Sequence, residues 1–229
     1  MMRPRGLVAI VLAGLVLGGC AFGAPSPTPG ACPSAAPTAD QADQILADAD
    51  RAVVTTSKGD FTITLDASSA PIATANFVAL IRCGFYDGLT FHRVIAGFVA
   101  QAGDPQTRVN HDVFDGLGTG GPGYRFEIEL PDQSLSYAHY MVAVANAMQY
   151  DFSTGEITGG TDTNGSQFFV LLGDAPTLRP YYSLLGTVTD GRAVVDAIGQ
   201  LPTSGNPYDT PLDPVIIESI SVEGGAAPS

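Results

Sequence analysis

The sequence predicts a mainly β domain, in which about eight antiparallel strands form a closed or nearly closed barrel capped by two helices. Three observations lead to this fold class. The 229 residues include 27 glycines and 17 prolines but only 14% charged side chains, a composition typical of turn-rich β architectures. Short apolar runs recur along the chain between these turn residues, as expected of short strands. Two other segments carry apolar residues at helical spacing.

The N-terminus is typical of a bacterial lipoprotein signal peptide. Two arginines precede an uncharged apolar run over 6–19, which is shorter than the about 20 residues of a membrane-spanning helix. The run ends in Leu-Gly-Gly-Cys, which resembles the lipobox that precedes a lipidated cysteine. We therefore expect a signal peptide over 1–19 and a lipid anchor on Cys20, at the extracytoplasmic face of a bacterial membrane. An uncleaved short anchor, or a secretory signal with an incidental cysteine, would predict the same export.

Residues 20–50 are expected to be the lipidated cysteine and a spacer rich in proline and alanine. Five prolines between positions 25 and 37 are spaced too closely for a helix or a strand ladder. The pattern from Asp40 to Arg51 would allow a short helix at the end of the spacer. The folded domain is expected over 51–224, followed by a tail over 225–229.

The domain is expected to begin with a β-hairpin and a helix. Residues 53–56 and 61–65 have strand composition and are joined by a short polar turn. Ser69 is a plausible N-cap for the helix that follows, and Pro71 would lie in its first turn. Apolar side chains then repeat at helical spacing until Gly84.

Further short apolar runs predict the rest of the barrel. They lie at 91–95, 98–102, 125–130, 141–145, 167–172, 184–188 and 215–222. Residues 192–201 would form the second helix, before the last of these strands.

The charge of the chain limits its partners. Ten Lys and Arg oppose 23 Asp and Glu, and the net charge of −13 disfavours binding to nucleic acid or to anionic lipid head groups. His111 and His139 show no metal-ligand spacing, so no metal is expected. The stretch 118–123 satisfies G-x-G-x-x-G, but Pro122 and the lack of a βαβ unit argue against a dinucleotide site, and no cofactor is expected.

The two cysteines other than Cys20 leave two alternatives open. Outside the cytoplasm, Cys32 and Cys83 could form a disulfide. They could equally be unconnected thiols, with Cys83 packed at the end of a helix.

Four groups of residues resemble the cyclophilin family of peptidyl-prolyl cis/trans isomerases, over 52–223. The matching stretches are Ala-Asn-Phe at 75–77 with Gly-Phe-Tyr-Asp-Gly at 84–88, the run that begins Phe-His-Arg-Val-Ile at 91–104, the glycine loop at 118–124, and Ala-Asn-Ala at 145–147 with Asn-Gly-Ser-Gln-Phe-Phe at 164–169. The resemblance implies a cyclophilin-like eight-stranded barrel, isomerase activity and proline-containing polypeptides as partners.

The resemblance also implies the residues of the site. A catalyst of X-Pro rotation must bind the twisted amide better than the planar forms, through an apolar proline seat, donors for the carbonyl and an electrophile near the nitrogen. Arg93 would be that electrophile, and Gln101 would orient it. The implied substrate-binding residues are Phe98, Val99, Ala145, Asn146, Gln167, Phe169, Leu178 and Tyr182. His92 would point to the opposite face of the strand, in a structural role.

The sequence also departs from the family. Thr177, Tyr182 and Leu185 stand where many cyclophilins carry tryptophan, histidine and phenylalanine, so cyclosporin binding is expected to be weak. The segment 148–162 is about a dozen residues longer than the usual link. It could be a mobile acidic flap that selects substrates, or a neutral surface loop.

We expect a monomeric isomerase that acts on X-Pro bonds of exported or surface proteins and assists their folding. A catalytically weak chaperone module that binds proline-containing peptides is the alternative, and an inert lipoprotein scaffold is a third. The presence of both Arg93 and Gln101 favours the enzyme.

Overall fold

The computed structural model describes residues 30–108 and 117–224 of the chain. The expected signal peptide over 1–19, the expected lipidation site Cys20 and the tail over 225–229 lie outside the described residues. Within the described ranges, no helix has the length and apolar character needed to cross a membrane.

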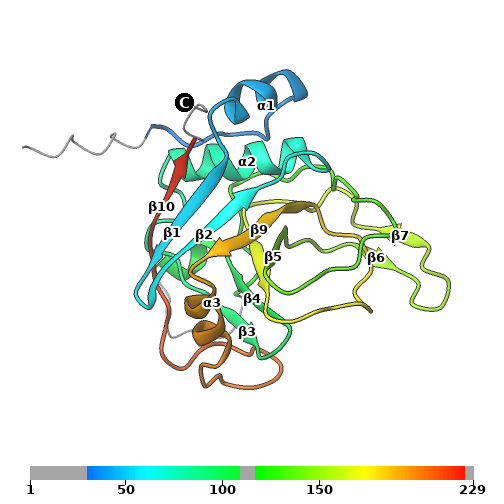
Figure 1. The fold of residues 1–229 in the computed structure, drawn as a ribbon. Coiled ribbons are helices and arrows are strands. Elements are labelled where there is room, and N and C mark those ends of the chain that lie inside the picture. The colour runs from blue at the N-terminus through cyan, green and yellow to red at the C-terminus, as the bar shows by residue number, and fades with distance from the viewer. Residues whose placement is uncertain (1–29, 109–116, 225–229) are drawn as a thin grey trace, which may run out of the picture.

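Eight strands form one curled antiparallel sheet, and the chain is mainly β, as predicted (Figure 1). The strands are β1 Arg51–Thr56, β2 Gly59–Leu65, β3 Arg93–Ile95, β4 Val99–Ala102, β5 Met141–Val144, β8 Phe168–Leu171, β9 Leu184–Asp190 and β10 Ile217–Glu223. They neighbour one another in the order β10-β1-β2-β9-β5-β8-β4-β3. The two edges meet where Thr90, ahead of β3, forms an isolated antiparallel bridge with Ile216, ahead of β10. The barrel thus closes through the segments that precede its edge strands.

Alternate side chains of the central strands face the interior and the exterior of the barrel. In β8, Phe168 and Val170 belong to the main core. Phe169 and Leu171 belong to a second apolar cluster, which therefore lies on the outer face. The strands β4 and β5 follow the same alternation, so one patch of the outer surface is lined by neighbouring strands of the same sheet.

In the described residues, two helices cap the ends of the barrel. Figure 1 shows α2 (Pro71–Arg82) across one end and α3 (Arg192–Gly199) at the other. A further helix, α1 (Ala39–Leu46), lies over α2, and the short 3-10 helix η1 (Pro105–Arg108) follows β4.

The N-terminus of α2 is capped by a residue from another part of the chain. The prediction of Ser69 as the cap was wrong: the helix begins at Pro71, and its N-cap residue makes no side-chain cap bond. The carboxylate of Glu129 instead accepts hydrogen bonds from the backbone N–H groups of Ile72, at 3.1 Å, and Ala73, at 2.7 Å. A carboxylate satisfies these free donors and interacts favourably with the helix dipole.

The predicted strand over 125–130 was also wrong. Phe126 forms only an isolated bridge with Asn164. The backbone N–H of Ile128 donates to the carbonyl oxygen of Thr161 at 2.7 Å, outside any strand. The apolar alternation is present, but loop contacts replace a strand ladder.

The end of the expected spacer packs against the barrel. Cys32 and Cys83 form a disulfide with their Cα atoms 5.2 Å apart, which decides between the two alternatives for these cysteines. The guanidinium of Arg82 in α2 binds the carbonyl oxygen of Ile45, at 2.9 Å, and the carboxylate of Asp48, at 2.5 Å. Residues 32–50 are therefore held on α2.

The insertion over 148–162 contains a β-hairpin of its own. Its strands, β6 (Gln149–Tyr150) and β7 (Ile157–Gly159), form a separate two-stranded sheet. Figure 1 shows this hairpin projecting away from the barrel. The insertion is therefore a regular element with its own backbone pairing.

Candidate active site

Strand register places four residues in one row on the outer face of the sheet. Arg93 in β3 pairs with Gln101 in β4, and Gln101 pairs with Phe169 in β8. Phe169 pairs in turn with Ala143 in β5. Because paired residues of neighbouring strands point to the same face, a cation, an amide and an aromatic ring lie side by side.

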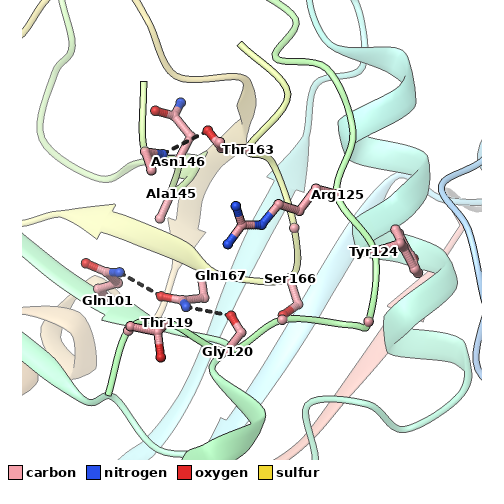
Figure 2. Close-up of a pocket in the computed structure, with 15 residues that line it drawn as sticks. Gln101, Thr119, Gly120, Tyr124, Arg125, Ala145, Asn146, Thr163, Ser166 and Gln167 are labelled. Atoms are coloured by element: carbon pink, nitrogen blue, oxygen red, sulfur yellow. Dashed lines mark hydrogen bonds between the residues drawn. The ribbon is translucent and has the colours of Figure 1, made fainter. Parts of the chain in front are cut away.

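A relay of hydrogen bonds fixes the polar part of this row. Nη1 of Arg93 donates to Oε1 of Gln101 at 3.3 Å. The side-chain amide of Gln101 donates to Oε1 of Gln167 at 2.9 Å, and that of Gln167 donates to the carbonyl oxygen of Gly120 at 2.8 Å (Figure 2). The guanidinium is thereby connected to the backbone of the glycine loop.

The apolar part of the row borders a cavity of about 200 Å³. Its lining residues are Arg93, Phe98, Val99, Gln101, Ala145, Asn146, Phe169, Leu178 and Tyr182. The ring of Tyr182 stands edge-on to that of Phe169, with centroids 5.2 Å apart. Burial raises the pKa of the Tyr182 hydroxyl, so this rim group is neutral at physiological pH. One charged donor thus faces a hollow of side-chain size whose apolar wall includes Phe98, Val99, Phe169 and Leu178.

The rim at Tyr182 is fixed from below by Tyr137. Tyr137 is fully buried, and its hydroxyl donates to the carbonyl oxygen of Tyr182 at 2.8 Å. The same hydroxyl accepts a hydrogen bond from the backbone N–H of Tyr182 at 3.1 Å. Both backbone groups of the rim residue are therefore held by one buried side chain.

A second, larger cavity of about 680 Å³ adjoins the first, since Gln101, Ala145 and Asn146 line both. Its other lining residues are Gly118, Thr119, Gly120, Gly121, Gly123, Tyr124, Arg125, Ala147, Thr163, Gly165, Ser166 and Gln167. Figure 2 shows the guanidinium of Arg125 pointing into this cavity. The two cavities form one groove, with Arg93 at the smaller cavity and Arg125 at the larger one.

The wall of the larger cavity is built around Asp104, which is fully buried. Its carboxylate accepts hydrogen bonds from the backbone N–H groups of Gly118 at 2.6 Å and Gly120 at 3.2 Å, and from that of Gln106 at 2.8 Å. A Cβ added at Gly120 would lie 2.1 Å from Oδ1 of Asp104. The loop therefore needs glycine at this position to approach the carboxylate.

Asn146 lies where the two cavities meet. Its side chain donates to the carbonyl oxygen of Tyr181 at 2.9 Å and accepts from the backbone N–H of Met148 at 3.1 Å. No described residue pairs with its backbone N–H or C=O. Those two groups are free to pair with an extended peptide in the manner of an added strand.

His92 is buried beside Arg93, as the sequence predicted for the opposite face of the strand, with 3% of its surface exposed. Neither ring nitrogen has a hydrogen-bond partner among the described residues. Burial lowers the pKa of His92 to about 4, so the imidazole is neutral at physiological pH. It acts as part of the framework under the site.

The structure gathers every predicted substrate-binding residue at this groove, with Gln167 in the larger cavity and the others in the smaller one. Sequence reasoning missed Arg125 as a site residue, because it was placed in a strand. A charged residue directly after a glycine loop was the available signal. Thr177 is exposed and lines neither cavity, whereas Leu185 is buried in the core.

The described residues contain no group of three or more His, Cys, Asp or Glu side chains placed to hold a metal ion. His111 lies outside the described residues.

Comparison with known proteins gives one family. The model of the cyclophilin type peptidyl-prolyl cis-trans isomerases matches residues 51–222. Peptidyl-prolyl cis-trans isomerase A of Mycobacterium tuberculosis is 38% identical over 188 residues, which cover 75% of this chain and 91% of that protein. A peptidyl-prolyl cis-trans isomerase of Helicobacter pylori is 38% identical over 160 residues, covering 69% and 85%.

Solved structures give the same result. A cyclophilin type isomerase of Cryptosporidium parvum superposes with a TM-score of 0.64 at 28% identity, and covers 78% of this chain and 99% of its own. A structure of that protein in the presence of the dipeptide Ala-Pro has a TM-score of 0.62 at 29% identity, covering 76% and 99%.

Proposed function

The chain belongs to the cyclophilin-type peptidyl-prolyl cis-trans isomerases, and we propose that its groove isomerises X-Pro bonds in polypeptides outside the cytoplasm. The observation that supports this use of the groove most directly is the position of Arg93. A guanidinium oriented by Gln101 faces a hollow of about 200 Å³ with an apolar wall. Proline-containing polypeptides are the proposed substrates, in line with the Ala-Pro dipeptide studied with the Cryptosporidium relative.

The proposed mechanism breaks no bond. Rotation about an X-Pro amide meets a barrier of about 20 kcal/mol, because conjugation of the nitrogen lone pair is lost on the way. Arg93 would donate a hydrogen bond to that nitrogen when its lone pair is no longer conjugated, and would thereby favour the twisted state over both planar states. Gln101 is a positioning residue that holds the guanidinium.

The proline ring would occupy the smaller cavity. Phe98, Val99, Phe169 and Leu178 offer the apolar surface, and Tyr182 closes the rim. The free backbone groups of Asn146 would hold the residues beside the proline by strand-like pairing. The fixed ring and the fixed chain leave rotation of the amide between them as the remaining motion.

We further propose that the protein is exported and anchored through a lipid on Cys20. The signal-like N-terminus supports export. The disulfide between Cys32 and Cys83 gives independent support, because disulfides persist mainly in oxidising compartments. The substrates would then be newly exported or surface proteins whose folding waits on X-Pro isomerisation.

Replacing Arg93 tests the assigned mechanism. Arg93→Ala should lower kcat/KM on an X-Pro peptide by roughly a hundredfold or more, as for the loss of one preorganised transition-state donor. Arg51→Ala is the matched control, since Arg51 is exposed and paired with Glu223 on the far strand pair. Unchanged turnover of a folded Arg93→Ala variant would refute the mechanism.

Mass spectrometry of the mature protein tests the anchor. A diacylglyceryl modification at an N-terminal Cys20 is expected, and Cys20→Ala should accumulate as the longer precursor that carries no lipid and retains residues 1–19. An unmodified mature N-terminus at another residue would overturn the anchor without affecting the enzymatic proposal.

A further inference from the structure

We propose that the hairpin formed by β6, β7 and the turn between them is a second contact surface for the substrate chain, and that Phe152 at its tip binds an apolar side chain remote from the proline. This inference rests on the proposed function of the groove and deepens it. The occupant is the unfolded polypeptide whose X-Pro bond lies in the smaller cavity. The hairpin would thereby favour long unfolded chains over short peptides.

The turn of the hairpin has a defined shape. The carboxylate of Asp151 accepts hydrogen bonds from the hydroxyl of Ser153 at 2.5 Å and from its backbone N–H at 2.8 Å, and from the backbone N–H of Thr154 at 2.9 Å. These bonds lower the pKa of Asp151 to about 2. The backbone N–H of Gly155 donates to the carbonyl oxygen of Asp151 at 2.7 Å. Asp151 is thus occupied within the turn, and the turn fixes the direction of Phe152.

The base of the hairpin is packed on the segment that forms the rim of the groove. The ring of Tyr150 contacts that of Tyr181 edge-on, with centroids 5.1 Å apart. The hydroxyl of Tyr181 donates to the carbonyl oxygen of Gly155 at 2.6 Å. Arg179 lies over the Tyr150 ring at 5.8 Å and donates to the carbonyl oxygen of Phe152 at 3.4 Å. Since Leu178 and Tyr182 line the smaller cavity, this seam ties the hairpin to the proline seat.

The hairpin is continuous with the groove at its root as well. Asn146, which lines both cavities, bonds to Tyr181 and to the backbone of Met148. The backbone N–H of Ala147 donates to the hydroxyl of Thr163 at 2.9 Å, and both residues line the larger cavity. The insertion therefore leaves and re-enters the barrel at the edge of the site.

Phe152 is exposed although the hairpin around it is packed. It has 85% of its surface exposed, against 62% for Leu212 and 44% for Tyr208, the next most exposed large hydrophobic residues described. Its ring lies beside that of Tyr150, with centroids 4.9 Å apart. Covering such a side chain contributes about 1.5–3 kcal/mol of apolar transfer free energy, against which ordering one side chain on binding costs about 0.5–1.5 kcal/mol.

The length of the hairpin arm limits how far a substrate chain has to reach. Phe152 lies six positions after Asn146, and an extended chain spans at most about 3.3–3.6 Å per residue, so the tip lies within roughly 20 Å of the groove. A substrate chain that continues about six residues beyond the groove is therefore long enough to reach Phe152. An unfolded protein has this length, whereas a tetrapeptide with its proline in the smaller cavity has at most three residues left to extend toward the tip.

Phe152→Ser tests the proposal on three X-Pro peptides. The first peptide has four residues. The second, the long leucine peptide, has about sixteen residues, with leucines about six residues on either side of the proline, and the third, the serine peptide, has serines in place of these leucines. Relative to the wild type, the kcat/KM of Phe152→Ser should fall roughly five- to tenfold on the long leucine peptide and should be unchanged on the other two. Leu212→Ser is the matched control and should match the wild type on all three.

Equal kcat/KM of the wild type and Phe152→Ser on the long leucine peptide would overturn the inference. So would an equal loss on the tetrapeptide, because that would indicate a structural role for Phe152. Failure of the proposed function gives a different result, in which the wild type itself turns over none of the peptides.

A binding measurement separates the hairpin from catalysis. The chain contains no tryptophan, so Phe152→Trp introduces a single indole at the tip, which can be excited at wavelengths that the tyrosines do not absorb. In an Arg93→Ala background, the long leucine peptide should shift its emission to shorter wavelength, and the serine peptide should not. No shift at peptide concentrations that saturate the groove would contradict the proposed contact.

Discussion

The orientation of Gln101 is decided by the two ends of the relay to which it belongs. A guanidinium can only donate hydrogen bonds, and the carbonyl oxygen of Gly120 can only accept them. The two amides between them, Gln101 and Gln167, must therefore both turn their nitrogen toward the glycine loop. The oxygen of Gln101 is left facing Arg93.

Removing the hydrogen-bond donor of Gln167 should weaken catalysis although Arg93 itself is unchanged. The carboxylate of Gln167→Glu cannot donate to the carbonyl oxygen of Gly120, which leaves two acceptors facing each other. We expect kcat/KM to fall roughly 5- to 30-fold, corresponding to about 1–2 kcal/mol. Peptide isomerisation assays against the exposed control Gln133→Glu check this. A full rate in a folded Gln167→Glu variant would mean that the relay does not position Arg93.

His92 should make stability depend on pH. Its pKa is lowered by burial from 6.5 to about 4, so between these values the unfolded chain binds a proton that the folded protein does not. The contribution of neutral His92 to the free energy of unfolding is therefore fully present above about pH 6.5. As the pH falls toward 4, the free energy of unfolding decreases by roughly 3 kcal/mol. Urea unfolding at successive pH values measures this, and His92→Gln should flatten the profile. A wild-type profile that is flat from pH 6.5 to 4 would contradict it.

Arg125 should bias the groove toward anionic substrates. Its guanidinium points into the larger cavity, and no ion pair with a described carboxylate engages it. Peptides with a glutamate beside the X-Pro bond should therefore have a lower KM than those with a lysine, and Arg125→Glu should reverse the order. Because the side chain is exposed, a several-fold change is expected, and it should weaken at high salt. If the glutamate and lysine peptides have the same order of KM in the wild type and in Arg125→Glu, this role of Arg125 is excluded.

At the scale of elements, the barrel and its helix depend on a contact between distant segments. Glu129 both caps α2 and receives support from the barrel, since its backbone N–H donates to the hydroxyl of Ser183 at 2.9 Å. That hydroxyl donates in turn to the carbonyl oxygen of Glu129 at 3.0 Å. The loop segment that contains Glu129 thus fastens the helix to Ser183, directly before β9.

Glu129→Ala should lower the free energy of unfolding by about 1–2 kcal/mol, because two backbone donors at the start of α2 lose their acceptor. Glu129→Gln should cost less, since the amide oxygen still accepts while the charge is absent. Chemical denaturation of the two variants checks the order. Equal stability of Glu129→Ala and the wild type would show that water replaces the carboxylate without cost.

At the scale of the whole molecule, the disulfide between Cys32 and Cys83 joins the end of the spacer to α2. The two cysteines are 51 residues apart in the sequence. A cross-link over this separation restricts the unfolded chain and thereby raises the free energy of unfolding by about 2–4 kcal/mol. It also shortens any tether that begins at Cys20, because the chain becomes part of the barrel at residue 32. The domain would then be held near the membrane surface.

Removing both cysteines should free this segment. In Cys32→Ser/Cys83→Ser, residues 30–50 should become cleavable by proteases, and the melting temperature should fall, while the tetrapeptide kcat/KM should be unchanged, because neither cysteine lines the groove. Limited proteolysis with mass spectrometry, with and without reductant on the wild type, measures the effect. Equal protection in the variant would show that α1 and the ion pair of Arg82 with Asp48 suffice.

The sequence by itself determined the fold class, the main strands near the groove and the residues that gather there. These follow from local information: period-two alternation places His92 and Arg93 on opposite faces of one strand, and the motifs of the family identify Arg93, Gln101 and Phe169. The register that brings these three onto one face is a property of the fold. The pairing of the cysteines, by contrast, remained open until the fold was known.

Only the tertiary structure decided the remaining features, because each depends on contacts between segments far apart in the chain. Glu129 replaced Ser69 as the cap of α2 because the fold brings a carboxylate to that helix, and no local rule contains this. Arg125 became a site residue because its segment is held by loop contacts instead of a ladder. The insertion formed a hairpin whose Tyr150 packs on Tyr181, and this non-local aromatic contact fixes where Phe152 is exposed.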